Sequence, residues 1–144
     1  MCSNYEAVSR ADRLLSFFGV VRGRDDPTAT VFPTGLAPFI RIAEDGSGNR
    51  RVDDGAFGLL PSFAKELAYG RRTYNARSET VATLPSFRDA WRRSQRCIVP
   101  AESIFEPSYE TGKAVRWRIL SSVCQPMRKR RPPSGGLIPK RPGE

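Results

Sequence analysis

Histidine is absent from this 144-residue chain, so no imidazole is available for acid/base catalysis, for activating a nucleophile or for binding a metal. Cysteine is scarce, and its three residues, Cys2, Cys97 and Cys124, are widely spaced with no C-x-x-C pair. Such a set provides neither a disulfide framework nor a zinc site. We therefore expect free thiols, no metal and no other cofactor, and we exclude Cys-His and Ser-His mechanisms within this chain.

Long apolar runs are also missing. No stretch of about 18 apolar residues could form a membrane span, and residues 1–6 have neither the basic start nor the apolar core of a signal peptide. The length and a hydrophobic content of 39% fit one globular domain and leave no room for a second. We expect a cytoplasmic monomer without membrane attachment.

The formal charge of +9 is distributed unevenly along the chain. Residues 1–120 carry 18 Lys/Arg against 14 Asp/Glu, whereas residues 121–144 add six against one. The positive charge favours an anionic partner. The stretch 128–136 is basic and rich in Pro and Gly, so we expect residues 121–144 to be disordered.

Short helical patterns alternate with short strand patterns, which is typical of an α+β fold. Capping-box patterns at 9–12 and 86–89 predict a helix over 10–18 that ends at Gly19, and a second short helix that begins near Ala90. Ser62 is expected to cap a further short helix that stops at Gly70.

Strand patterns are equally short. Residues 36–43 and the turn-rich link to Arg51 predict a hairpin, with Pro38 at an edge or a bulge. Residues 97–99 indicate a buried strand, and the alternation over 115–119 indicates a half-buried one.

Cys2 gains a special chemistry if Met1 is removed. The new α-amine would have a pKa of about 7.7–8.0 beside a thiol of pKa about 8.5. The amine can condense with an aldehyde to an imine, and the thiol can then close a five-membered thiazolidine ring on the same carbon. A ring-opened abasic site in DNA offers such an aldehyde, although Cys2 alone is more simply explained as an incidental terminal residue.

Other motifs accompany Cys2. Four segments stand out: F-G-L-L-P-S-F at 57–63, the hexapeptide N-A-R-S-E-T at 75–80, R-C at 96–97 and F-E-P at 105–107. Together with the N-terminal cysteine, they resemble motifs of the SRAP family, the SOS response-associated peptidase-like, abasic-site processing proteins. The resemblance runs from Met1 to about Ile119. It implies an SRAP-like domain over 2–120 with a mixed, barrel-like β-sheet and short flanking helices.

The resemblance also implies the activity. It predicts covalent attachment to abasic sites in single-stranded DNA in the DNA-damage response, with a nucleoid association when bound, and it carries an older proposal of thiol autopeptidase activity. Cys2 would be the nucleophile, Asn75 would position its amine or the opened sugar, and Glu106 would assist in opening the sugar. In a site without imidazole, a carboxylate whose pKa is raised by burial is a plausible proton carrier.

DNA contacts are expected from three further residues. The planar guanidinium of Arg77 suits a phosphate, and Phe57 and Phe63 would stack on or wedge beside bases. Simpler explanations stay open: an Arg77–Glu79 surface ion pair, aromatic residues that only fill the core, an Asn75 that satisfies buried backbone and a solvated Glu106.

The chain departs from the family pattern in several places. Ser3-Asn4 stands where the family usually has Gly-Arg, Thr30 stands near a usual Asn, and a later histidine has no counterpart. The change at Leu120 from patterned sequence to a basic tail is typical of a truncated or frame-shifted reading. Two alternatives follow: an N-terminal-cysteine peptidase that uses its own amine as base, and a fragment that binds nucleic acid without catalysis.

Overall fold

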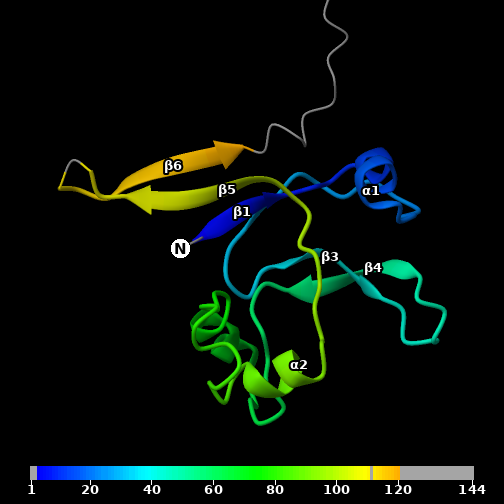
Figure 1. Cartoon of the computed structure of the whole chain (residues 1–144). Coiled ribbons are helices and arrows are strands. Elements are labelled where there is room, and N and C mark those ends of the chain that lie inside the picture. Colours follow the sequence, from blue (N-terminus) through cyan, green and yellow to red (C-terminus); the bar gives the residue numbers. More distant parts are fainter. Residues whose placement is uncertain (1–2, 111, 121–144) are drawn as a thin grey trace, which may run out of the picture.

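The computed structural model describes residues 3–110 and 112–120, and its central element is a four-stranded sheet (Figure 1). Its strand order is β2-β1-β5-β6, with bounds β1 Asn4–Ala7, β2 Thr30–Val31, β5 Ala101–Ser108 and β6 Val115–Leu120. Each adjacent pair is antiparallel. The sheet therefore joins the beginning of the chain to residues about one hundred positions later.

The predicted hairpin is confirmed as a separate two-stranded sheet of β3 (Leu36–Ile42) and β4 (Arg50–Ala56). Pro38 lies opposite Asp54 in an unbroken register, so it occupies an edge and not a bulge. Ile40 is fully buried and forms a bridge with Ile98 on the other side of β3.

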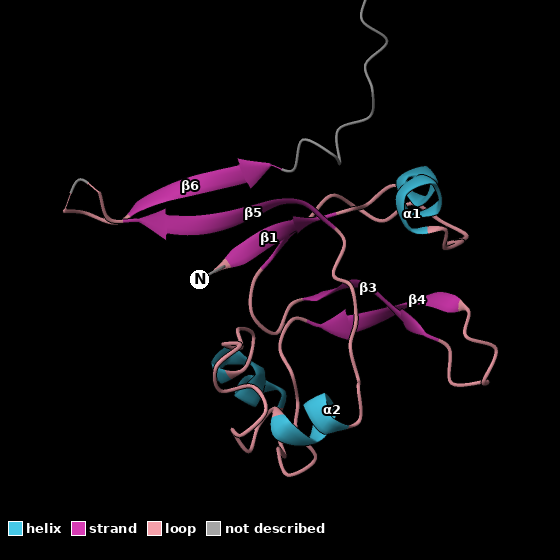
Figure 2. Ribbon diagram, viewed as in Figure 1, coloured by secondary structure: helices cyan, strands magenta, loops and turns pink. Residues whose placement is uncertain are grey.

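The α+β class is confirmed, because the structure combines short helices with sheets whose named strand pairs are antiparallel (Figure 2). The expected mixed, barrel-like sheet is wrong for the described residues. All their named strand pairs are antiparallel, and the four-stranded sheet is open, with β2 and β6 at its two edges. Without a pairing between these edges, the ladder of hydrogen bonds does not close into a barrel.

Helix α1 (Ala11–Phe18) agrees with the prediction to within one residue. Gly19 ends it with φ of 68° and donates its N–H to the Leu15 carbonyl at 2.9 Å, as predicted. The Ser9 capping box is wrong. The N-terminal N–H of Ala11 instead donates to the carboxylate of Asp25 at 2.7 Å, which a local pattern cannot reveal.

The remaining helices lie in residues 61–96, which we call the helical segment, while residues 3–60 and 97–120 form the strand part. The helical segment contains the 3-10 helix η1 (Leu67–Arg72) and α2 (Arg88–Arg92). The predicted helix from Ser62 to Gly70 is therefore misplaced. Ser86 does not cap α2 with its side chain, because its hydroxyl hydrogen-bonds the Tyr69 hydroxyl at 3.0 Å.

Two apolar clusters form the core, and both belong to the strand part. One contains Tyr5, Ala7, Val31 and Ala37, with Phe57 and Ile104 packed against it. The other contains Val8, Leu14, Val20 and Ile40. The core thus lies between the four-stranded sheet, the hairpin and α1.

Two strand predictions need correction. Residues 97–99 are exposed, and only Ile98 pairs with another strand, so this run is a connection and not a buried strand. Strand β6 exists, but all six of its residues are exposed because it is an edge of the sheet. The expected disorder of residues 121–144 lies outside the described residues. No helix in the described ranges is long and apolar enough to cross a membrane.

Candidate functional site

The start of β1 is held against the middle of β5. Ser3 donates its backbone N–H to the Phe105 carbonyl at 3.0 Å and its hydroxyl to the same oxygen at 3.3 Å. Asn4 then pairs with Phe105 in the sheet and is buried. Cys2 itself lies outside the described residues, but the residue that follows it is fixed beside the strand that carries Glu106.

Glu106 lies on the face of the sheet that covers the core. In the antiparallel register, side chains of directly opposed residues lie on the same face. Tyr5 is opposite Ile104, and Glu106 follows Ile104 by two residues, so Glu106 shares its face with Tyr5. Glu106 is half-buried, which favours a partly desolvated carboxylate over a fully solvated one.

Phe57 connects this sheet to the segment that carries Asn75. Its ring contacts Tyr5 edge to face at a centroid distance of 5.1 Å and Tyr74 at 5.6 Å. Tyr74 directly precedes Asn75, which is half-buried. The aromatic row Tyr5, Phe57 and Tyr74 therefore sets the position of Asn75 relative to β1, a linkage that sequence reasoning missed.

The backbones of Gly58 and Gly70 approach closely and fix the start of the segment that carries Asn75. Gly58 has φ of 134°, and a Cβ there would lie 2.6 Å from the Gly70 carbonyl oxygen. Beyond it, Thr73 donates its hydroxyl to the Leu59 carbonyl at 2.6 Å, and Leu59 donates its N–H to the Thr73 carbonyl at 3.2 Å. The structure thus explains the glycine of the F-G-L-L-P-S-F motif, because only glycine permits the close contact between Gly58 and Gly70.

Arg77 lies at the start of a turn that follows Asn75. Its carbonyl accepts the N–H groups of Thr80 and Val81, at 3.1 and 2.9 Å, while its side chain is exposed. Among the described residues the structure shows no ion pair between Arg77 and Glu79. The guanidinium is therefore available to an external anion.

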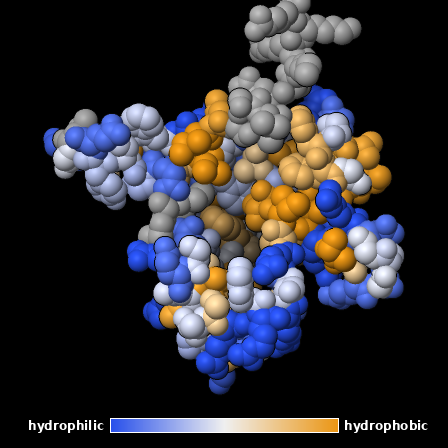
Figure 3. Space-filling model, in the orientation of Figure 1, coloured by the Kyte–Doolittle hydropathy of each residue, from blue (hydrophilic) through white to orange (hydrophobic). Residues whose placement is uncertain are grey.

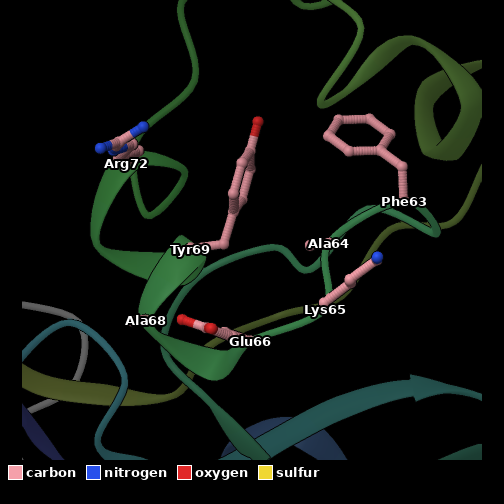
Figure 4. A pocket seen from close by; sticks show the side chains of 7 residues that line it. All are labelled: Phe63, Ala64, Lys65, Glu66, Ala68, Tyr69 and Arg72. Atoms are coloured by element: carbon pink, nitrogen blue, oxygen red, sulfur yellow. The ribbon is translucent and has the colours of Figure 1, made fainter.

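Phe63 lies in a different place, on the helical segment. It is 54% exposed and contacts Tyr69 edge to face at 5.7 Å. Both rings line an open pocket of about 330 Å³ together with Lys65 and Arg72 (Figure 4). The structure thus separates Phe57, which packs between two tyrosines, from Phe63, which faces solvent.

An apolar cavity of about 420 Å³ adjoins the aromatic row. Its lining includes Tyr5, Phe57 and Tyr74, together with Pro38 of β3 and Cys97. Cys97 is exposed as a residue, but partial burial of its thiol raises the pKa of that thiol, which keeps it protonated and poorly nucleophilic near neutrality. Within the ranges 3–110 and 112–120, no group of three or more Cys, Asp or Glu side chains is arranged to hold a metal ion.

The opposite face of the sheet carries a polar network. Glu6 accepts hydrogen bonds from the buried Ser103 hydroxyl at 2.9 Å and from Arg118, and Arg118 also donates to the Ser103 oxygen at 3.1 Å. Arg116 lies over the Phe105 ring at 3.8 Å. These contacts join β6 to β1 across β5 and hold the strand that carries Glu106.

Comparisons with known proteins agree with the sequence motifs. The family model described as SOS response associated peptidase (SRAP) matches residues 1–128. The chain is 36% identical over 110 residues to abasic site processing protein YobE of Bacillus subtilis (strain 168), covering 74% of this chain and 48% of YobE. It is 34% identical over 133 residues to abasic site processing protein YoaM of the same strain, covering 89% of this chain and 52% of YoaM.

A solved structure shows the same fold. The crystal structure of a protein from Bordetella bronchiseptica matches with a TM-score of 0.70 and 34% identity, over 85% of this chain and 59% of that one. The chain spans about half the length of the curated relatives it matches. With a family model that covers most of its residues, the chain belongs to the SOS response associated peptidase (SRAP) family.

Proposed function

We propose that this chain processes abasic sites in DNA and captures the ring-opened sugar covalently on Cys2. Relatives that share about a third of its residues are named abasic site processing proteins. The observation that carries the proposal is the pair of hydrogen bonds from Ser3 to the Phe105 carbonyl. They support a fixed position for the residue after Cys2, next to Glu106.

The chemistry starts with removal of Met1. The free α-amine of Cys2 adds to the C1′ aldehyde of the opened sugar, and loss of one water gives an imine. The thiol then adds to the imine carbon, its proton passes to the nitrogen, and a thiazolidine closes. The net reaction is aldehyde plus aminothiol giving thiazolidine plus water, so no oxidant, metal or cofactor is required.

The other site residues receive roles that suit their surroundings. Glu106 moves protons during sugar opening, and Asn75, held through Tyr74 and Phe57, orients the amine or the opened sugar. Arg77, exposed at its turn, binds a phosphate beside the lesion. Because Phe57 packs edge-on against Tyr5 and Tyr74, positioning suits it better than stacking on a base.

The test uses Met1-trimmed protein and single-stranded DNA with one abasic site on a denaturing gel. The proposal expects a shifted band that intact DNA does not give. Cys2→Ala should lose the stable band yet keep a borohydride-reducible imine, because its α-amine remains. Cys97→Ala is the matched control and should leave the band unchanged.

A stable band that survives Cys2→Ala would overturn the thiazolidine. The family description also contains the word peptidase. Cleavage of an undamaged peptide that depends on Cys2, without any DNA adduct, would favour an N-terminal-nucleophile peptidase instead.

A further inference from the structure

Trp117 lies directly opposite Glu106 in the four-stranded sheet. The register of β5 with β6 pairs these two residues, and directly opposed residues of an antiparallel pair lie on the same face with Cβ atoms about 4.5–5.5 Å apart. Glu106 shares its face with Tyr5, so Trp117 does as well. The indole is therefore within reach of the carboxylate to which the proposed function assigns proton transfer.

β5 lies between β1 and β6, so Glu106 has a different neighbour on each side. On the β1 side, Ser3 donates to the Phe105 carbonyl and fixes the residue after Cys2. On the β6 side, the opposed residue is Trp117. β6 is an edge of the sheet, and no further strand among the described residues lies beyond it (Figure 1). The Trp117 side chain thus separates Glu106 from the solvent at this edge.

The side chains of β6 divide by character between the two faces. Val115, Trp117 and Ile119 lie on the face that carries Glu106 and are 44%, 53% and 45% exposed. Both arginines of β6 lie on the other face, where each contacts a neighbouring strand. No guanidinium of β6 therefore faces Glu106. Figure 3 shows an apolar surface at the end of β6, beside a hollow under the sheet.

An indole in this position acts on a glutamate in two ways. Packing against the ring restricts a side chain that otherwise samples many rotamers. The ring also takes the place of water molecules that would surround the carboxylate at an open sheet edge. A proton carrier must lie within hydrogen-bond reach of the reacting atom, so a carboxylate that is held in place raises the rate.

We propose that Trp117 is a positioning residue that holds the Glu106 carboxylate towards the start of β1, where Cys2 captures the opened sugar. The inference rests on the proposed function, in which Glu106 moves protons. Trp117 acts through Glu106 and not by binding DNA, so its loss slows the chemical step and leaves the affinity for DNA unchanged. Trp117 belongs to neither core cluster, and its truncation should therefore leave the fold intact.

The test measures single turnovers of adduct formation by Met1-trimmed protein, in excess over single-stranded DNA with one abasic site. Trp117→Ala should lower the maximum rate about tenfold, because a displacement of about 1 Å costs up to about 100-fold. The half-saturating protein concentration should change by less than about twofold. Trp117→Phe keeps a ring in place and should recover most of the rate. Val115→Ala is the matched control on the same face, opposite Ser108, and should react like the wild type.

A double-mutant cycle with Glu106→Gln separates the positioning of Glu106 from any other role. In the Glu106→Gln protein, Trp117→Ala should change the residual rate by less than about twofold, because the group that Trp117 positions is already lost. Circular dichroism in the far ultraviolet shows that each variant is folded. An equal loss of rate in both backgrounds, or a weaker affinity for DNA with an unchanged maximum rate, would overturn the proposal.

Tryptophan emission reports the placement of Glu106 without any chemistry. The chain has two tryptophans, so Trp91→Phe leaves Trp117 as the single indole. In this protein Glu106→Gln should change the emission of Trp117. Glu110→Gln, in the exposed turn after β5, is the control and should not change it. An emission that does not respond to Glu106→Gln would contradict the placement.

This inference and the proposed function fail separately. If wild-type protein gives no adduct but the emission of Trp117 responds to Glu106→Gln, the covalent function fails and the placement of Glu106 by Trp117 stands. If the adduct forms and Trp117→Ala has the maximum rate of the wild type, the placement fails and the proposed function stands.

Discussion

Most arginines of the strand part lie in ion pairs, whereas those of the helical segment lie mostly in solvent. Arg22 contacts Asp26 at 2.5 Å and Asp54 at 2.8 Å, and Arg41 contacts Asp53 at 2.7 Å. Arg71, Arg72, Arg92 and Arg93 show no such partner within the described residues. The same side chain therefore serves the internal structure in one region and is left for an external anion in the other.

Burial divides the molecule in the same way. Both apolar clusters lie in the strand part, and no residue of η1 or α2 other than Gly70 is buried. The strand part thus contains most of the stabilising contacts, and the helical segment presents side chains to solvent.

Leu14→Ala should give the largest loss of stability. Leu14 is fully buried in the second core cluster, and truncation of such a leucine costs about 2–5 kcal/mol of unfolding free energy. Its neighbour Leu15 is 54% exposed, so Leu15→Ala should stay within about 0.5 kcal/mol of the wild type. Urea unfolding measures both, and an equal loss for the two would contradict the assigned core.

Gly58→Ala should combine destabilisation with loss of chemistry. The added Cβ would overlap the Gly70 carbonyl in a backbone conformation that L-residues rarely adopt, for a cost of about 2–4 kcal/mol. Because this contact supports the Asn75 segment, the yield of DNA adduct should also fall. Gly23→Ala is the control, since a Cβ there meets nothing within 4 Å. An unchanged melt and adduct yield for Gly58→Ala would refute the role of the contact.

Asp26→Asn should lower the unfolding free energy by about 1.5–3 kcal/mol near neutral pH and should weaken its dependence on pH in the acid range. The hydrogen bond from Arg22 lowers the pKa of Asp26 below its ordinary value of 3.8. A lowered carboxyl pKa stabilises the fold above the ordinary value, and this stabilisation is lost as pH falls through the folded pKa. Unfolding free energies measured from pH 6 downward should converge for the two proteins below pH 3.8. A constant difference at every pH would rule out the linkage.

Local patterns predicted the elements whose signals are local. The apolar run over 36–43 and the turn that follows it predict the hairpin, and Gly19 predicts the end of α1. The pairing of β1 with β5 was not predicted, because it joins residues about one hundred apart and β1 is only four residues long. Residues 97–99 were wrongly read as buried, since a short apolar run does not reveal what covers it.

The candidate site was predicted from motifs, not from geometry. The family resemblance pointed to Asn75 and Glu106, but the contacts that hold Asn75 depend on Tyr5 and Tyr74, which no motif singled out. A charge count over the whole chain directed attention to the basic tail. A count of charged residues over a window of about 36 residues would have detected the surplus of Lys/Arg over Asp/Glu in the helical segment.

Arg92→Gln should have the smallest effect on stability, and a matched change in the strand part should have a clear one. Arg92 repels Arg88 four residues before it but attracts Asp89 three residues before it and lies in the last turn of α2, where a cation is favourable, so these small effects offset and the change should stay within about 0.5 kcal/mol. Arg22→Gln in the strand part instead removes ion pairs with Asp26 and Asp54 from a largely buried side chain and should lower stability. Thermal melts should therefore separate the two variants, and the small effect of Arg92→Gln should shrink further at high salt because screening weakens exposed charge interactions. A loss of stability for Arg92→Gln that persists at high salt would mean that this arginine serves the internal structure after all.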